Sequence, residues 1–171
     1  PIVASGPNSA IPHAQTGSRC LKSGDAVVLD FGCVYEGYCS DMTRTVVIGR
    51  ADNKLKKIYN WVKAAQQLAL DGLEAGMTGG AADALARDYF KLHRQAAKFG
   101  HSLGHGVGMD VHELPILAKT STQKLQPGMV FTIEPGLYLS GFGGVRIEDM
   151  VVMESDGPNI LTTAGKDLIE L

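Results

Sequence analysis

The sequence predicts an α/β protein in which two helices lie between two pairs of antiparallel strands. Three observations support this prediction. Apolar segments rich in valine and bounded by glycine occur in two pairs, one near each end of the chain. Between the pairs lie two stretches with apolar residues three and four apart, which is the spacing of an amphipathic helix. A short frame of glycines around an acid also recurs in both pairs.

The composition is that of a globular domain. Of the 171 residues, 44% are hydrophobic and 20% are charged, enough for a sizeable core without a disulfide or metal. Sixteen Lys and Arg against eighteen Asp and Glu, with no run of either sign, predict neither a nucleic-acid nor a membrane partner. No apolar stretch reaches the ~20 residues of a membrane span. Cys20, Cys33 and Cys39 form no CxxC pair, which favours reduced thiols and a cytoplasmic location.

The first pair of strands is a predicted β-hairpin. Segments 25–35 and 38–49 are rich in Val, Tyr and Thr, and the two-residue turn Glu36-Gly37 separates them. The chain itself opens on another strand-like stretch, PIVASG, without an initiator Met. We therefore expect the chain to be a piece of a longer polypeptide.

This hairpin places two acids on one face of the sheet. Pairing across the turn, counted back along both strands, puts Asp41 opposite Gly32, where the missing side chain leaves room. Asp41 then shares a face with Asp30 at a diagonal distance of roughly 7 Å. Bare carboxylates among apolar side chains are costly to bury, so a positive partner is expected. That partner is either a salt bridge to Arg44 or Arg146, or a pair of metal ions.

Two amphipathic helices are predicted next. Asp52 caps the first, which ends near Gly76, and Thr78 caps the second, which Gly100 stops. Both helices have one apolar face and are expected to lie on the same sheet. The apolar stripes consist of Leu55, Ile58, Val62, Ala65, Ala69 and Leu73 in the first helix, and Leu85, Tyr89, Leu92 and Ala96 in the second.

The last third of the chain repeats the pattern of the first hairpin. Segment 101–115 is too rich in glycine for a helix and predicts sharply turning backbone, and segments 129–138 and 144–153 predict two more strands. The recurring frame G-x5-[DE]-x-G, together with a later Asp-Met pair, indicates two similar half-sheets. The frames are Gly24, Asp30 and Gly32 against Gly128, Glu134 and Gly136, and the pairs are Asp41-Met42 and Asp149-Met150.

Acids at strand ends and one histidine form a candidate metal site. Glu134 and Glu148 end apolar strands, and with Asp30, Asp41 and His105 they make four carboxylates and one imidazole. The charges of four carboxylates cancel those of two divalent cations, and oxygen-rich ligation favours Mn, Co or Zn over thiolate-preferring metals. Two such ions can hold a bridging water, lower its pKa and polarise a carbonyl. The set therefore predicts hydrolysis.

Five motifs in order resemble one family. VVLDFG, SDMTRT, GHGVGMDVHE, TIEPG and GVRIED closely resemble the catalytic domain of the Xaa-Pro aminopeptidases and prolidases, in the methionine aminopeptidase and creatinase superfamily. The resemblance runs from about Ile2 to Val152. It implies a pita-bread fold, with two pseudo-symmetric halves around a curved antiparallel sheet, and two divalent ions, Mn first and Co or Zn as alternatives. The implied metal ligands are Asp30, Asp41, His105, Glu134 and Glu148.

The resemblance also implies catalytic residues beside the metal. These are His13, His101, His112, Glu134 and Arg146. His101 and His112 are expected to contact the substrate carbonyl and stabilise the oxyanion, and Glu134 to carry a proton to the leaving nitrogen. His13 is expected to line the site, Arg146 to orient a carboxylate, and Tyr138 to add a hydroxyl nearby. The alternatives are turn, core or exposed histidines and a cross-strand partner of another acid for Arg146.

The resemblance predicts a peptidase that hydrolyses the N-terminal Xaa-Pro bond of peptides with proline at the second position. Methionine aminopeptidase, creatinase-like C–N hydrolysis without metal, and a non-catalytic peptide-binding module are the alternatives. Residues 1–171 are expected to be a partial catalytic domain, without the N-terminal helices and N-terminal domain of such proteins. An uncovered apolar sheet face favours association, so a homo-oligomer is expected.

Overall fold

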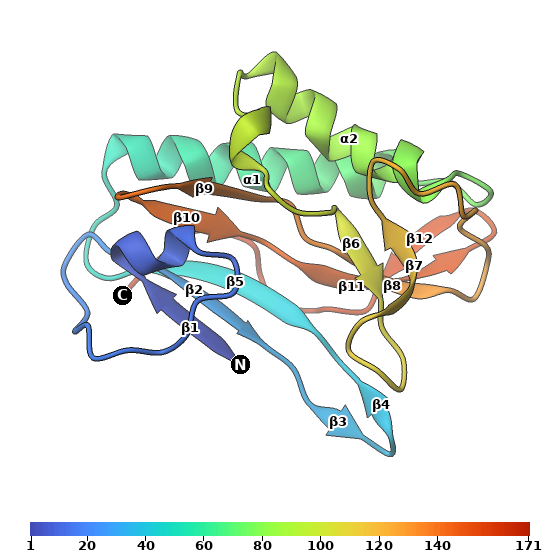
Figure 1. The fold of residues 1–171 in the computed structure, drawn as a ribbon, viewed down its shortest axis with the longest axis horizontal. Helices are drawn as coiled ribbons and strands as arrows, with labels where there is room; N and C mark the ends of the chain where they lie inside the picture. The colour runs from blue at the N-terminus through green and yellow to red at the C-terminus, as the bar shows by residue number, and fades with distance from the viewer.

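The computed structural model describes residues 1–171. Strands β1, β2, β5 and β13 form one sheet, and β12, β11, β8, β6 and β7 form a second. The helices α1 and α2 lie on one side of the sheets, and the small hairpin β3–β4 projects away from them (Figure 1). The helices are η1 (Gly6–Ala10), α1 (Asn53–Gly72), α2 (Gly79–Leu92) and η2 (Ala96–Lys98).

The strands fall into the two halves that the sequence predicts. The first half contains β1 (Ile2–Ser5), β2 (Ala26–Phe31), β3 (Val34–Tyr35), β4 (Tyr38–Cys39) and β5 (Met42–Val47). The second half contains β6 (Gly104–Gly106), β7 (Glu113–Leu117), β8 (Val130–Ile133), β9 (Gly136–Leu139), β10 (Gly143–Arg146), β11 (Asp149–Glu154) and β12 (Gly157–Ile160). The terminal strand β13 (Ile169–Glu170) returns to pair with β5, in parallel.

Strands β2 to β5 form one long antiparallel hairpin. The predicted turn is present, with Tyr35 paired to Tyr38 across Glu36 and Gly37, whose φ angles of 49° and 87° suit a two-residue hairpin turn. The same register continues into β2 and β5. Regular pairing is interrupted only where the candidate ligand Asp41 stands, at Gly32-Cys33 and Ser40-Asp41.

Strands β8 to β11 repeat this arrangement. β8 pairs with β11 and β9 with β10 in one register, interrupted at Glu134-Pro135 and Ile147-Glu148. Each predicted strand of this half is therefore split in two. Pro135 helps to interrupt the first of them, because proline has no N–H to donate to the neighbouring strand. Asp41 and Glu148 both directly precede a strand, β5 and β11 respectively. Glu148, and not Asp149 as the repeat in the sequence indicated, is thus the structural match of Asp41.

The two hairpins meet along β5, which joins the sheets into a continuous surface. Thr43 forms a bridge to Glu148, whose amide donates to the Thr43 carbonyl at 3.1 Å. The Thr45 hydroxyl likewise donates to the carbonyl of Arg146 at 2.8 Å. The candidate ligands of the two halves are therefore brought together by backbone pairing.

Both predicted helix caps are present. The side chain of Asp52 accepts from the amide of Leu55, and that of Thr78 from the amide of Ala81. The helices end earlier than predicted, at Gly72 and Leu92, since the backbone of Leu73 is extended and Arg94 has a positive φ of 56°. The predicted stripe of α1 is buried in one core with strands β8 to β11. The predicted stripe of α2 is wrong, because this helix buries Ala82, Ala86 and Phe90 instead and leaves Leu92 exposed. Neither helix has the length and hydropathy that crossing a bilayer requires.

Gly32 permits a close approach between the two strands of the first hairpin. A Cβ at this position would lie 1.7 Å from the carbonyl oxygen of Ser40, so the glycine makes room for backbone rather than for an ion. We expect Gly32→Ala to lower the free energy of unfolding by about 3 kcal/mol, because the strands must separate. Urea denaturation measures this. Gly17→Ala is the control, since a Cβ there meets nothing within 4 Å; equal midpoints for both variants would contradict the prediction.

Candidate active site

A cavity of about 880 Å³ opens between the two hairpins. Its floor is acidic, and its wall includes the glycine-rich segment that carries His101 and His105. Every residue that the sequence predicted as a metal ligand or catalytic residue lines this cavity, whereas Tyr138, predicted to add a hydroxyl nearby, does not. The predicted residues that line the cavity are His13, Asp30, Asp41, His101, His105, His112, Glu134, Arg146 and Glu148.

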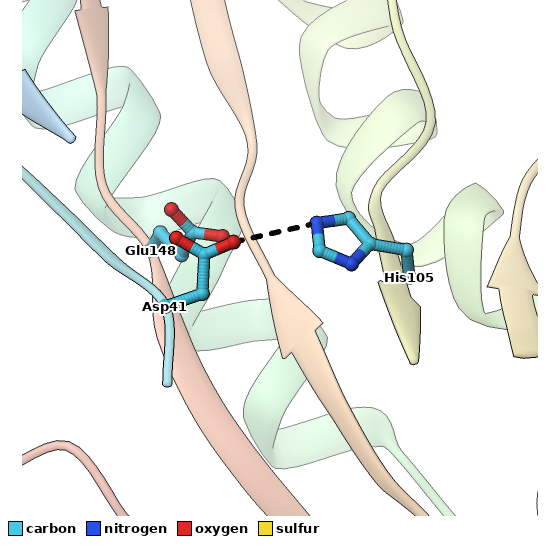
Figure 2. A group of neighbouring side chains, drawn as sticks. All are labelled: Asp41, His105 and Glu148. Carbon is cyan, nitrogen blue, oxygen red and sulfur yellow. Dashed lines mark ion pairs between the residues drawn. The ribbon is translucent and has the colours of Figure 1, made fainter. Parts of the chain in front are cut away.

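Three of the predicted ligands converge most closely. One ligand atom each of Asp41, His105 and Glu148 lie within 4.8 Å of one another. Figure 2 shows the two carboxylates side by side, with the imidazole edge of His105 facing them. Asp41 and Glu148 come from the interruptions of the two hairpins, and His105 comes from β6. Segments more than 100 residues apart thus supply one cluster.

The hydrogen bonds of His105 leave one ring nitrogen facing the acids. Its Nδ1 lies 3.0 Å from the carbonyl oxygen of Gly106, which can only accept, so Nδ1 carries the proton in the neutral ring. Nε2 lies 3.3 Å from Glu134 Oε1 and 3.7 Å from Asp41 Oδ2. In the metal-free protein a proton on Nε2 can join it to Glu134. When that proton leaves, the neutral imidazole presents a lone pair to the acids, as metal-binding histidines do.

The acids of the cluster raise one another's proton affinity. Burial, followed by the charges of Asp30 and Glu134, raises the pKa of Asp41 to about 6. Burial and the neighbouring charges of Glu134 and Asp41 raise the pKa of Glu148 well above its usual value. Crowded carboxylates with a free imidazole nitrogen are the donor set of a hard or borderline divalent cation. The residues present therefore fit a metal of this class.

The pKa of Glu134 is lowered and the pKa of His105 is raised, in each case against the effect of burial. Burial alone raises the pKa of Glu134, but its hydrogen bond with His105 and the electrostatic effects of His101, His105 and Arg146 outweigh burial and lower that pKa. Burial alone lowers the pKa of His105, but Glu134 and Asp41 outweigh it and raise that pKa. Glu134 is consequently ionised near neutral pH.

The pKa of Asp41 predicts how the stability of the metal-free protein depends on pH. Between about pH 4 and pH 6 the unfolded chain has lost this proton and the folded chain retains it, so stability falls as pH rises and stays low above pH 6. The expected loss is on the order of 3 kcal/mol. Thermal unfolding across this range measures it.

The matched variant for this measurement is Asp41→Asn, which keeps the shape and removes the titration. Its stability is expected to lack the Asp41 part of the fall between pH 4 and pH 6. An equal slope in both proteins would contradict the prediction. Adding a divalent cation at neutral pH is expected to restore stability to the unmodified protein more than to the variant.

Asp30 is held by an arginine. Its Oδ2 accepts from Nη2 of Arg146, whose Nη1 also donates to the Tyr138 hydroxyl at 2.9 Å. The salt bridge to Arg146, one of the two positive partners expected for Asp30 and Asp41, is therefore present for Asp30. Asp41 has no arginine partner, and Arg44 pairs with Asp149 instead. Burial raises the pKa of Tyr138 to about 12, so its hydroxyl keeps its proton.

The predicted substrate-contacting histidines differ in their surroundings. His101 is half-buried, with Nδ1 2.8 Å from the Ser102 carbonyl oxygen and Nε2 2.8 Å from the Tyr138 hydroxyl. Burial lowers the pKa of His101. His112 is exposed and stacks on His105 with ring centroids 4.0 Å apart; its pKa is lowered by burial and then by His105. His13 is exposed at the cavity rim.

Two threonines support the acids and were not predicted from the sequence. The Thr43 hydroxyl donates to Glu148 Oε2 at 2.5 Å, and the Thr132 hydroxyl donates to Glu134 Oε1 at 3.2 Å. Both sit on strands with the same side-chain alternation as a nearby acid, Thr43 two residues after Asp41 and Thr132 two residues before Glu134. This spacing is the signal that could have identified them.

The similarity to known proteins extends over nearly the whole chain. The chain is 49% identical over 170 residues to the uncharacterized peptidase YqhT of Bacillus subtilis, and the match covers 99% of this chain and 48% of that protein. At 42% identity it is similar to the Xaa-Pro dipeptidase of Pyrococcus furiosus, covering 98% of this chain and 48% of the relative. The chain thus spans about half the length of these curated relatives.

The fold of the chain also closely matches a solved structure. The Xaa-Pro dipeptidase from Bacillus anthracis superposes with a TM-score of 0.98 at 50% identity, over 99% of this chain and 48% of that one. The predicted pita-bread fold is thereby confirmed. The model of metallopeptidase family M24 matches residues 1–155, which include every predicted site residue. The chain belongs to metallopeptidase family M24.

Proposed function

We propose that residues 1–171 supply the metal-binding catalytic domain of a peptidase that cleaves the N-terminal Xaa-Pro bond of peptides. The convergence of Asp41, His105 and Glu148 within 4.8 Å is the observation on which this rests. Relatives at 42% and 50% identity bear the name Xaa-Pro dipeptidase. Retention of all five predicted ligands weighs against a non-catalytic binding module.

The ligands proposed for the metal are the four carboxylates and the imidazole of the cavity floor. Two divalent cations, Mn first and Co or Zn as alternatives, would lower the pKa of a water and polarise the scissile carbonyl. Asp41 and Glu148 would face the cations from the two hairpins, and His105 would offer Nε2. Arg146 would orient Asp30, because it donates to that carboxylate and to Tyr138.

Glu134 is the proposed proton carrier. It is ionised near neutral pH because its neighbours lower its pKa, so it can accept a proton from the attacking water and pass it to the leaving nitrogen. The Thr132 hydroxyl, 3.2 Å from Oε1, fixes which way the carboxylate turns. His112, exposed above His105, is free to donate to the substrate carbonyl. His101 is the second proposed contact, and its Nε2 would exchange the Tyr138 hydroxyl for the substrate carbonyl. His13 lines the entrance.

The rim of the cavity suits a peptide. Its exposed apolar side chains come from two segments, 31–34 and 111–116, above an acidic floor. Apolar walls with a few convergent polar groups are typical of sites that bind organic substrates. A short peptide can therefore bury side chains against the rim while its scissile bond reaches the acids. The apolar rim residues are Phe31, Val34, Val111, Leu114 and Ile116.

The test compares substrates and metal content in one preparation. The protein is loaded with Mn²⁺, its bound metal is counted, and release of the first residue is followed from Ala-Pro-Ala, Ala-Pro and Met-Ala-Ala. We expect about two equivalents of metal and cleavage of the proline peptides. Fewer than one equivalent, or preferred cleavage of Met-Ala-Ala, would overturn the proposal. The ratio of Ala-Pro-Ala to Ala-Pro cleavage distinguishes aminopeptidase from dipeptidase.

Location and assembly complete the proposal. Cys20, Cys33 and Cys39 are all unpaired, as expected of a protein that works in the cytoplasm. Several large apolar side chains on the first sheet and its hairpin are exposed, including Val3, Phe31 and Tyr35. Association through such surfaces supports a homo-oligomer, which light scattering at several concentrations would test.

A further inference from the structure

A buried ion pair outside the cavity contacts the segment that carries His101. Asp83 and Arg87 lie one turn apart on α2 and form two parallel hydrogen bonds, Nε to Oδ2 at 2.6 Å and Nη2 to Oδ1 at 2.8 Å. Their side chains are only 1% and 13% exposed, so this is not a solvated surface pair of the usual helical kind. Neither residue lines the cavity or belongs to the predicted site.

The pair holds the backbone of 99–103 at three points. Arg87 donates to the carbonyl oxygens of Phe99 at 3.0 Å and His101 at 2.8 Å. Asp83 Oδ1 accepts from the amide of Leu103 at 3.1 Å. This segment belongs to no helix or strand. The Leu103 amide also donates to the Leu117 carbonyl at 2.8 Å, so the groups that depend on the pair are the carbonyls of Phe99 and His101. All of these contacts come from one face of α2.

Aromatic stacking continues the contact to the His101 ring. The Arg87 guanidinium lies 4.2 Å from the centroid of the Phe99 ring, and Phe99 packs edge-on against His101 with centroids 5.0 Å apart. On its far side the His101 ring meets the Tyr138 hydroxyl, which Arg146 holds. The imidazole is therefore fixed by Arg87 through both its backbone and its ring neighbour.

The geometry points to Asp83 and Arg87 as a positioning pair that sets the orientation of the His101 imidazole in the site. This inference rests on the proposed function for its catalytic consequence, but its structural part stands without it. The pair touches no substrate or metal and acts through His101. His105 follows in β6, where the Thr132 hydroxyl fixes its amide, so it has support of its own.

The test replaces the pair without leaving a bare buried charge. In the double variant Asp83→Asn with Arg87→Met, the amide oxygen introduced at position 83 can still accept from Leu103, while both carbonyl contacts are lost. We expect kcat to fall by about 10- to 100-fold, as for other supporting partners of site residues. The midpoint of Mn²⁺ binding is expected to change little, since Asp41 and Glu148 come from other elements. Arg87→Lys is expected to recover part of kcat.

Histidine NMR supplies a readout that a merely structural role would not move. The chain has five histidines, so their ring signals can be assigned by substitution. We expect the His101 ring signals to shift and its Nδ1 proton to exchange faster in the double variant, with His93 unchanged. Asp25→Asn with Arg19→Met is the matched control, because Arg19 and Asp25 form a similar paired contact and neither lines the cavity. This control is expected to leave kcat and the His101 signals unchanged.

The outcomes separate this inference from the proposed function. If the double variant folds and binds Mn²⁺ but keeps kcat and its His101 signals, the inference is wrong. If kcat falls only in proportion to lost metal, the pair acts on His105 and the inference is also wrong. If the unmodified protein cleaves no Xaa-Pro peptide, the proposed function fails, while the His101 signals still decide whether the pair orients that ring.

Discussion

Replacing Glu148 with glutamine is expected to abolish tight binding of a divalent cation and, at the same time, to stabilise the metal-free protein. Glu148 is 2% exposed, and burial with the nearby acids raises its pKa well above the usual value. A neutral amide removes that unfavourable charge and can still accept from the Thr43 hydroxyl. Metal affinity is expected to fall by at least about 100-fold, because even outer partners of a ligand are worth 10- to 100-fold.

The measurement is urea unfolding with and without Mn²⁺ at pH 7. In the unmodified protein, metal at 100 times its dissociation constant is expected to add about 2.7 kcal/mol, and in the variant this gain should vanish. Glu154→Gln, at the end of the strand that follows Glu148, is the control, since Glu154 is exposed and its side chain bonds only Asn159. The variant is therefore expected to be more stable than the unmodified protein without metal and less stable with metal. A misfolded variant would be less stable in both conditions. A variant less stable in both conditions would contradict the prediction.

Local sequence patterns were sufficient for the hairpins and the helix starts. The Glu36-Gly37 turn fixes the register of the first hairpin, and counting back from it put Asp41 opposite Gly32, in the register that the structure continues. Asp52 and Thr78 cap the helices because a side-chain oxygen there satisfies an otherwise free amide. These features depend on residues a few positions apart, which a single sequence reveals.

The partners of the charged residues could not be derived in the same way. Arg44 and Arg146 were both open as partners of the first two acids, and the choice depends on how two hairpins about 100 residues apart meet at Thr43 and Glu148. The position of Tyr138 between His101 and Arg146 depends on the same meeting. Nothing in the spacing of these residues sets that arrangement.

Two neighbouring acids of the second hairpin have different surroundings: Glu148 lines the cavity and Asp149 pairs with Arg44. Glu148 and Asp149 are adjacent, and because successive strand residues point to opposite faces, only the first reaches the cavity. The repeat in the sequence matched Asp41 to Asp149, since both precede a methionine. The family motif GVRIED indicates Glu148, which lines the cavity, because the motif carries the register of the whole hairpin and two short frames do not.

Replacing Asp149 with alanine is expected to be among the most destabilising changes in the chain. Asp149 is 1% exposed and accepts from Arg44 at 2.6 Å, Gln66 at 2.7 Å and Lys166 at 3.0 Å. Removing it leaves two cations without the carboxylate that balances their charge, and Gln66 already has one unpaired oxygen. Breaking a buried ion pair from one side costs about 3–5 kcal/mol, so the free energy of unfolding is expected to fall by that amount.

The loss should reach the metal site as well as the core. Arg44 also donates to the Glu148 carbonyl and to the carbonyls of Ala164 and Gly165, so it joins the C-terminal segment to the backbone of a proposed ligand. Urea unfolding and Mn²⁺ titration of Asp149→Ala measure the two effects. Asp167→Ala is the control, because its pair with Lys63 is solvent-exposed and its loss should leave both unchanged. Equal stabilities of these two variants would show that Asp149 is not the centre of a buried network.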